Sequence, residues 1–135
     1  MKNSFKTNIA TTIGLIGIFA VLTAFTIPSP WDIPEKYKKM KNPTKATKQS
    51  LMIGKMLYNK HCKSCHGSNG EGDGPKARRL ETTMRDFGND EVKNQADGVL
   101  YYKSFIGRGE MPNFEKDIPE KEDRWFIINY MRSFE

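Results

Sequence analysis

Cysteine and histidine are scarce in this sequence: there are two of each among 135 residues, and all four lie between His61 and His66. A structural zinc site needs four nitrogen or sulfur ligands, usually from two separated pairs, and the sequence offers no second pair. A thioredoxin-like redox pair expects a surrounding βαβ pattern, but strand-like alternation of useful length is missing. Zinc and thioredoxin-type sites are therefore disfavoured, while a dithiol or a simple disulfide remains an alternative that leaves His66 without a role.

The two cysteines are spaced as Cys62-x-x-Cys65 and are followed at once by His66. Two thiols three positions apart lie about one helical turn apart on the same side of a short helix. There both can add to the vinyl groups on one edge of a porphyrin. C-x-x-C-H is the signature of c-type haem attachment, and imidazole is the usual proximal ligand of haem iron. We therefore predict one covalent haem c on Cys62 and Cys65 with His66 on the iron, and we expect His61 at a helix end or on the surface.

No charged residue occurs between Lys6 and Asp32, and most of this run is apolar or small. With Lys2 and Lys6 before it, this layout predicts that residues 1–27 form a signal peptide or an N-terminal membrane anchor. The run is long enough to span a bilayer and lacks a convincing cleavage site, which favours a retained anchor. Trp31 follows the run and suits either the membrane interface or contact with the folded domain.

Basic residues are concentrated after that run. Residues 31–60 hold eight lysines and two acidic residues, whereas residues 62–135 hold twelve basic and fourteen acidic residues, and the whole chain carries +6. A basic segment favours a redox partner with an acidic docking surface or an anionic membrane surface, unless it is only a solvated linker. Four prolines among residues 28–46 predict an extended, semi-rigid tether there. Nucleic-acid binding is not expected, because no aromatic-rich base-stacking face accompanies the lysines.

The lysine count on the two sides of the apolar run would place the C-terminal part of the chain in the cytoplasm. Covalent attachment of haem in bacteria, however, is expected to take place outside the cytoplasm, and this expectation outweighs the lysine count. We therefore predict a location on the periplasmic side of the cytoplasmic membrane, anchored there, or soluble in the periplasm if the leader is cleaved.

Helical periodicity predicts that residues 47–135 form an all-α haem domain of three to five helices. The first helix is expected from Thr47 to the haem motif. Gly54 lies inside it, and since glycine costs about 1 kcal/mol relative to alanine in a helix, its use indicates a close helix–helix crossing. The stretch from Gly67 to Pro75 contains four glycines and a proline, which predicts a loop near the proximal haem face.

Two further helices are expected in the second half of the chain. Asp97 is predicted to cap a helix over residues 98–106, which Gly107 ends. Pro119 is predicted to open the last helix. The side chains expected on the core face of that helix are Trp125, Ile127, Ile128, Tyr130, Met131 and Phe134.

The sixth position of the iron depends on a second ligand, and methionine sulfur there raises the potential and suits electron transfer. Most of the seven methionines lie in the leader, the tether, the first helix or the terminal core face. Met84 and Met111 remain. Met111 lies in a loop between helices and precedes Pro112, which stiffens the backbone, so we predict Met111 as the second axial ligand and keep Met84 as the alternative.

Over residues 47–135 the sequence resembles class I cytochromes c, the small monohaem electron carriers. The resemblance is carried by the haem motif, the Gly-rich loop, the methionine loop and the positions of Gly54 and Trp125 in the first and last helices. It implies thioethers on Cys62 and Cys65, His66 as proximal and Met111 as distal ligand. It also implies that Pro75 lies on the proximal side and that Gly54 crosses the stretch from Trp125 to Tyr130. The apolar leader and the tether resemble those of membrane-tethered members.

The resemblance implies an electron carrier rather than an enzyme, with one haem c and weakly bound respiratory redox partners. A haem subunit docked permanently in a respiratory or dehydrogenase complex is the alternative. A haem enzyme that reacts with peroxide or a gas is less favoured, since no spare histidine stands opposite His66 as an acid–base group.

Overall fold

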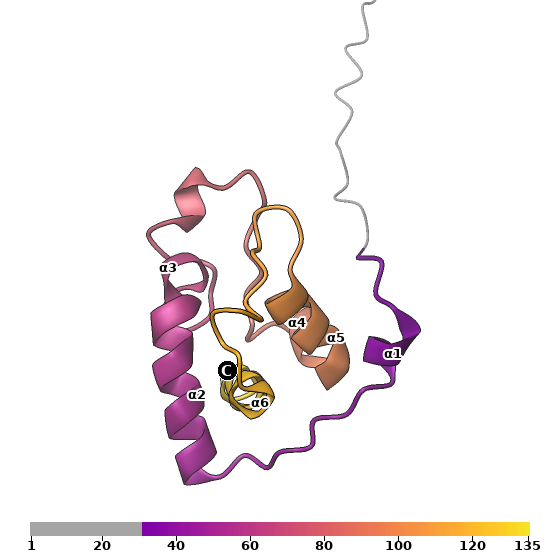
Figure 1. Cartoon of the computed structure of the whole chain (residues 1–135). Coiled ribbons are helices and arrows are strands. Elements are labelled where there is room, and N and C mark those ends of the chain that lie inside the picture. Colours follow the sequence, from indigo (N-terminus) through magenta and orange to yellow (C-terminus); the bar gives the residue numbers. More distant parts are fainter. Residues whose placement is uncertain (1–30) are drawn as a thin grey trace, which may run out of the picture. The chain divides into compact units, whose positions relative to one another are not determined.

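The computed structural model describes residues 31–135, which form one unit of helices joined by loops (Figure 1). Within these residues there is no strand, so the expected all-α class is confirmed. Residues 47–135 contain five α-helices, within the expected range of three to five, and one further helix, Glu35–Lys38, precedes them in the described part of the chain. Three of these helices are single turns of four residues. The helical elements are α1 (Glu35–Lys38), α2 (Lys48–His61), α3 (Lys63–His66), the 3-10 turn η1 (Ala77–Arg79), α4 (Asp90–Lys93), α5 (Asp97–Tyr101), the π-helical segment η2 (Tyr102–Ile106) and α6 (Lys121–Met131).

Helix α2 begins where the sequence predicts. The Thr47 hydroxyl accepts a hydrogen bond from the backbone N–H of Ser50 at 3.1 Å, and the Ser50 hydroxyl accepts one from the backbone N–H of Thr47 at 2.8 Å. This reciprocal capping box satisfies amide groups that have no partner in the first helical turn. The helix then runs for fourteen residues to His61 and brings the chain directly to the haem motif.

Helices α2 and α6 cross at Gly54. A β-carbon added there would lie 2.1 Å from the carbonyl oxygen of Phe126 and 3.0 Å from the β-carbon of Tyr130. Only glycine therefore allows this approach of the two backbones. Figure 1 shows α6 almost end-on beside the length of α2. The close crossing expected from the sequence is confirmed.

The core lies between α2, the α5–η2 helix and α6. Aromatic contacts dominate it: the rings of Tyr101 and Trp125 have centroids 4.5 Å apart, and those of Tyr58 and Tyr130 are 5.4 Å apart in an edge-on arrangement. Such aromatic pairs add to the stabilisation that apolar burial supplies. The largest fully buried side chains are Trp125, Tyr58, Phe105, Ile118, Ile127 and Ile128.

The helix expected over residues 98–106 is present, but its start differs from the prediction. Helix α5 begins at Asp97 itself, and its N-cap, Ala96, offers no side-chain hydrogen bond. The Asp97 carboxylate instead pairs with Arg132, with 2.7 Å between Oδ1 and Nη2. The helix continues as the π-helical segment η2 and ends at Gly107, whose φ of 71° is favoured by glycine.

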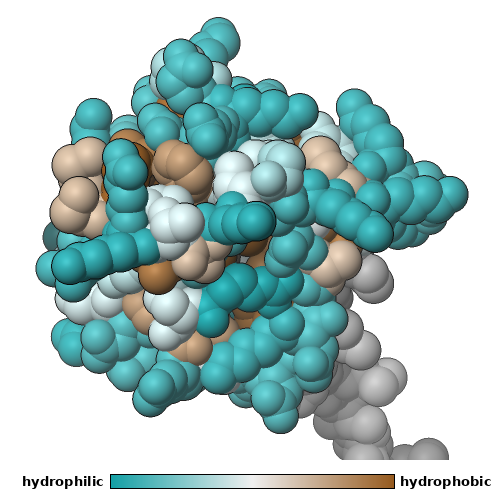
Figure 2. Space-filling model, turned by 90° about the horizontal axis from the view of Figure 1, so that it is seen from below, coloured by the Kyte–Doolittle hydropathy of each residue, from teal (hydrophilic) through white to brown (hydrophobic). Residues whose placement is uncertain are grey.

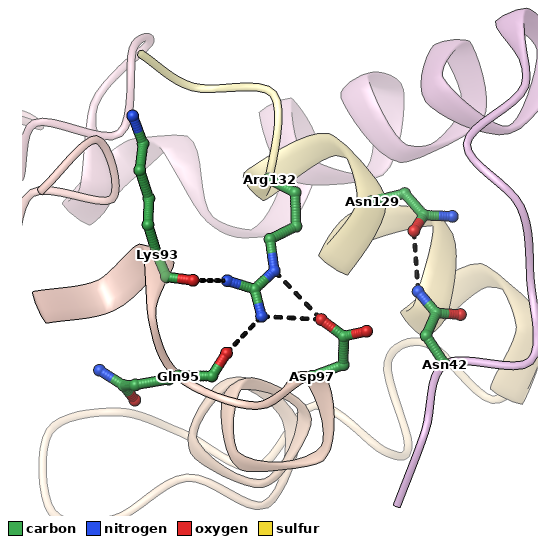
Figure 3. Close-up of polar contacts among 6 residues, drawn as sticks. All are labelled: Asn42, Lys93, Gln95, Asp97, Asn129 and Arg132. Carbon is green, nitrogen blue, oxygen red and sulfur yellow. Dashed lines mark hydrogen bonds and ion pairs between the residues drawn. The ribbon is translucent and has the colours of Figure 1, made fainter. Parts of the chain in front are cut away.

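The guanidinium of Arg132 joins the end of α6 to the chain before α5 (Figure 3). It donates to the Asp97 carboxylate and to the backbone carbonyls of Lys93 and Gln95. A planar guanidinium can satisfy several acceptors at once. Arg132 therefore fixes the α4–α5 corner against α6 although the residues lie far apart in the sequence.

Residues 31–46, expected to belong to an extended tether, instead pack against the helices. The side chain of Ile33 is buried, and the Tyr37 ring contacts that of Tyr102 at 4.7 Å between centroids. Figure 3 shows the Asn42 amide donating to Asn129 of α6, over 2.7 Å. The folded unit therefore begins at Trp31, because apolar and amide side chains among the prolines find partners on α5 and α6.

The predicted signal peptide or anchor at residues 1–27 lies outside the described residues, as do the first prolines of the predicted tether. Among residues 31–135, no helix has the length and apolar character needed to cross a membrane. Hydrophilic residues cover most of the face drawn in Figure 2, and apolar side chains appear between them in small patches.

Candidate haem-binding site

The haem motif occupies the corner between α2 and α3. Cys62 lies between α2 and α3, and α3 carries Cys65 and His66. The backbone N–H groups of Cys65 and His66 both donate to the carbonyl of Cys62, over 3.1 and 3.0 Å. This single helical turn holds the three residues in the compact arrangement that the C-x-x-C-H spacing predicts.

Both cysteines are free thiols and are half-buried. Burial, followed by the neighbouring Cys65, raises the pKa of the Cys62 thiol to about 12. The attacking thiol of a redox dithiol has instead a pKa lowered towards neutrality. The structure therefore disfavours a thiolate-based redox site at Cys62, while thioether formation at both sulfurs is compatible with two unpaired thiols.

The side chain of His66 lies inside the domain, with 9% of its surface exposed. Neither ring nitrogen has a hydrogen-bond partner, although both are buried. Burial lowers the pKa of His66 to about 4, so the imidazole is neutral at physiological pH. Leaving a buried polar group unpaired costs about 1–3 kcal/mol. A buried, neutral, unpaired imidazole beside two free thiols fits a haem iron ligand.

The glycine-rich loop wraps around α3 through backbone hydrogen bonds. The N–H of Gly72 donates to the carbonyl of His66 over 2.9 Å, and the N–H of Gly74 donates to that of Cys65 over 3.1 Å. A β-carbon at Gly74 would lie 2.6 Å from the carbonyl oxygen of Ser64. The close approach requires glycine at this position, and it fixes the loop against the motif as the sequence predicts.

Tyr58 of α2 ties the same loop to the core. Its hydroxyl donates to the carbonyl of Gly67 over 2.9 Å, and the Tyr58 ring is fully buried. Among residues 31–135, no hydrogen bond joins His66 to Pro75, and Pro75 is exposed. The place on the proximal side of the haem that the resemblance implies for Pro75 therefore remains a prediction.

Met111 lies half-buried in the loop after η2. Its backbone exchanges two hydrogen bonds with Arg108: the Arg108 N–H donates to the Met111 carbonyl over 2.8 Å, and the Met111 N–H donates to the Arg108 carbonyl over 3.0 Å. The Glu110 carboxylate accepts from the backbone N–H groups of Glu81 and Thr82, over 3.1 and 2.8 Å. The methionine loop is thus closed by its own hydrogen bonds and attached to residues 81 and 82.

Met84, the alternative second ligand, is also half-buried. A β-carbon on Gly72 would lie 2.6 Å from the β-carbon of Met84, so Met84 packs against the glycine-rich loop. No described contact joins either methionine to His66. The assignment of Met111 as distal ligand therefore remains a prediction from its loop and from the resemblance.

The sequence reasoning missed two contacts of the site. The ring of Phe87 stacks on that of His66, with centroids 4.6 Å apart and an interplanar angle of 26°. The sequence offered no signal that pairs these two residues, because they belong to different segments of the chain. His61, expected at a helix end, is the last residue of α2, and its ring meets Phe114 edge-on at 6.0 Å. Within residues 31–135, no group of three or more histidine, cysteine or acidic side chains is suited to hold a bare metal ion.

Comparison with known proteins adds a family match. The family model described as cytochrome c matches residues 51–135. No match was found among curated proteins.

Three of the solved structures that are similar to the chain follow. A chain of the Kuenenia stuttgartiensis reducing HAO-like protein complex Kustc0457/Kustc0458 shares 28% identity with a TM-score of 0.55; the match covers 68% of the present chain and 46% of that one. The KustC0563 c-type cytochrome shares 26% identity with a TM-score of 0.52, over 61% and 96% of the two chains. Cytochrome cL from Methylophaga aminisulfidivorans shares 19% identity with a TM-score of 0.53, over 80% and 71%. The present chain thus matches less than half the length of the chain from the Kuenenia complex. The similarity to cytochrome cL, at 19% identity, concerns the fold alone.

Proposed function

Because this chain belongs to the cytochrome c family, we propose that it is a monohaem carrier of single electrons between respiratory redox proteins outside the cytoplasm. Members of the family bind haem c covalently, and this chain has the two cysteines that attachment requires. The observation that carries the proposal is the buried imidazole of His66, whose two nitrogens lack partners beside two free thiols.

In this proposal the residues have separate tasks. Cys62 and Cys65 would hold the haem through thioethers, and His66 and Met111 would supply the two ligands of its iron. The bound haem supplies a one-electron iron couple, whose potential depends on its axial ligands and on burial. The stack of Phe87 on the His66 ring restricts the orientation of the imidazole, so that little rearrangement of this ligand is needed when the charge of the site changes.

An electron carrier is favoured over a peroxide- or gas-reactive enzyme. An enzyme of that kind uses an acid–base group beside the open iron position. His61 is the only other histidine of the chain, and its ring lies against Phe114 next to Cys62. It is therefore poorly placed to act on a molecule bound opposite His66.

The outer face of α2 supports a partner with an acidic docking surface. Met52 and Met56 are 67% and 63% exposed, and α2 contains no acidic residue. The exposed lysines of this helix are Lys48, Lys55 and Lys60. Two exposed methionines among cations suit a small interface in which charge steers the encounter and the apolar centre is buried. Weak redox encounters typically bury under about 1,200 Å² in total.

A permanently docked haem subunit is the second candidate, and the likeness to a chain of the Kuenenia complex favours it. Its interface would be larger and more apolar than that of a shuttle. Purification from solubilised membranes separates the two possibilities: a shuttle is recovered alone at moderate salt, whereas a subunit is recovered in fixed ratio with its complex.

The proposed location is the periplasmic side of the membrane, through residues 1–27 if they are retained. The intact mass of the mature protein tests this. A retained anchor leaves the mass of the full chain plus one haem, whereas a cleaved signal removes the leader and leaves the haem on the remainder.

The axial assignment is tested by replacing each candidate methionine. Met111→Ala is expected to lower the midpoint potential measured by voltammetry and to let carbon monoxide bind the reduced protein, because the distal position loses its sulfur ligand. Met84→Ala is the matched control and should retain the wild-type potential and resist carbon monoxide. The reverse pattern would assign the ligand to Met84, and an unchanged potential in both variants would remove methionine ligation from the proposal.

A further inference from the structure

The segment before the matched region is held against the helices at several points. It precedes residues 51–135, yet it contacts both α5 and α6. A β-carbon on Gly98 would lie 2.0 Å from the Tyr37 carbonyl oxygen, so α1 and α5 are in backbone contact. Further along, the Asn129 amide donates to the Thr44 hydroxyl over 3.0 Å. These contacts fix the path of the segment on the domain.

Trp31 lies at the start of this segment and contacts η2 and the loop after it. Its half-buried ring meets Tyr102 edge-on, with centroids 6.3 Å apart. The Arg108 guanidinium lies over the indole at 4.3 Å from the ring centroid, and the Lys103 ammonium lies at 5.9 Å. Tryptophan is the aromatic ring that binds cations best. The indole therefore attracts the side chains of both Arg108 and Lys103, whose like charges would otherwise repel each other.

Arg108 is directly linked to Met111. The pair of backbone hydrogen bonds between them closes a tight turn. A β-carbon at Gly107 would lie 2.2 Å from the carbonyl oxygen of Met111, so the turn packs closely on its own start. A shift of Arg108 therefore moves the backbone of Met111, because two backbone hydrogen bonds join the ends of this four-residue turn and restrict its motion.

We propose that Trp31 is a positioning residue for the distal ligand: its indole holds Arg108, and Arg108 holds the turn that presents Met111. The inference rests on the proposed role of Met111. Through this contact, the segment before the matched region helps to keep the sixth coordination position of the iron closed. Glu110, in the same turn, accepts hydrogen bonds from the backbone N–H groups of Glu81 and Thr82, so the turn has a second attachment besides the contact of Arg108 with Trp31.

The test uses the full-length, haem-loaded protein and the Trp31→Ala variant. With the indole removed, the turn samples positions in which Met111 is off the iron, and carbon monoxide competes better. The loss of one cation–π contact corresponds to about a two- to fivefold tighter apparent affinity for carbon monoxide. At the same time, the weak long-wavelength absorption band of sulfur-ligated ferric iron should lose intensity, and the midpoint potential should decrease. Trp31→Phe keeps a ring under Arg108 and should restore most of the wild-type response.

Two further variants separate positioning from simple loss of packing. Tyr37→Ala removes stacking of the segment on Tyr102 and Tyr101 without touching Arg108; it should lower the thermal midpoint and leave carbon monoxide affinity unchanged. Arg108→Ala should reproduce the Trp31→Ala affinity, and the double variant should show no additional gain.

The outcomes distinguish the inference from the function on which it rests. If Met111→Ala opens the iron to carbon monoxide while Trp31→Ala does not, the axial assignment stands and the role of Trp31 is overturned. The role of Trp31 is also overturned if Tyr37→Ala raises the affinity as much as Trp31→Ala does. If Met111→Ala itself changes neither potential nor affinity, the axial assignment fails and the positioning role fails with it.

Discussion

The α-carbon of Gly54 faces the backbone of Phe126 so closely that a β-carbon would lie 2.1 Å from the Phe126 carbonyl oxygen. The position of a β-carbon is fixed by the backbone of α2, and the atom that it would meet belongs to the backbone of α6, so no side-chain rotation could relieve the clash. The contact between α2 and α6 therefore depends on one missing methyl group, and α2 is the helix that leads into the haem motif.

Gly54→Ala is expected to destabilise the protein even though alanine favours helix formation. Alanine gains about 1 kcal/mol in helix propensity, but separating two packed helices typically loses about 1–3 kcal/mol or more. We expect a net decrease in the free energy of unfolding, measured by denaturant titration. Lys55→Ala, at an exposed neighbouring position, is the control and should change stability by less than about 0.5 kcal/mol. Equal stability of the two variants would contradict the crossing.

Tyr58→Phe should lower stability by about 1 kcal/mol, since it removes one buried hydrogen bond and keeps the ring. The lost bond is the one from the Tyr58 hydroxyl to the Gly67 carbonyl. Burial raises the pKa of Tyr58 above its usual value of 10. The contribution of this hydroxyl is therefore complete below pH 10 and is lost as the pH rises above it. Unfolding titrations at neutral and strongly alkaline pH should show that the difference between wild type and variant shrinks at high pH; a constant difference would contradict this assignment.

Arg132→Lys should cost about 1–3 kcal/mol although the charge is kept. A lysine ammonium is unable to reproduce the planar set of donors that reaches Asp97 and two backbone carbonyls. The measurement is again the free energy of unfolding. The exposed pair between Arg85 and Glu91 provides the control, because Arg85→Lys should change stability by less than about 0.5 kcal/mol. A tolerated Arg132→Lys substitution would mean that the carbonyl contacts contribute little.

Protein without haem is expected to be largely unfolded. A folded unit of the size of residues 31–135 buries only about 65% of its unfolded surface, and the buried nitrogens of His66 lack partners among the described residues. A variant with both Cys62→Ser and Cys65→Ser, purified without haem, should show low helical circular dichroism and no cooperative thermal transition. A native-like transition in this variant would show that the helices are stable without the cofactor.

Electron transfer to a small anionic oxidant should depend on the lysines of α2. The rate constant with hexacyanoferrate(III), measured by stopped flow, is expected to fall as salt increases, because salt screens the attraction. Lys48→Glu and Lys55→Glu should lower both the rate at low salt and its salt dependence. Lys121→Glu, an exposed change at the start of α6, is the charge-matched control for a site outside α2. Equal effects at all three positions would indicate net charge rather than a docking face.

Local signals predicted much of this structure. Thr47 precedes a helical pattern and caps α2, Gly107 lies where left-handed backbone ends η2, and Gly54 interrupts an otherwise favourable helix where α6 crosses it. In each case the residue type has a conformational property that few other residues share. Such properties are visible without knowledge of the fold.

Contacts between distant parts of the chain were not predictable in the same way. Asp97 is of a residue type that often caps helices, but its carboxylate pairs with Arg132, thirty-five positions away. The prolines before residue 47 suggested an extended tether, yet Tyr37 and Asn42 pack on the domain because their partners come from the α5–η2 helix and from α6. The stack of Phe87 on His66 and the contact of Trp31 with Arg108 are of the same kind. Periodicity and spacing describe one element at a time, whereas these contacts depend on how the elements are packed.

The central claim is a covalent haem c with both axial positions filled, and the absorption spectrum of the purified protein tests it most directly. Spectra would be recorded oxidised and reduced, with and without carbon monoxide. The account predicts sharp c-type bands in the reduced protein that carbon monoxide leaves unchanged. Ready binding of carbon monoxide would contradict a filled sixth position, and absence of haem bands would contradict the site itself.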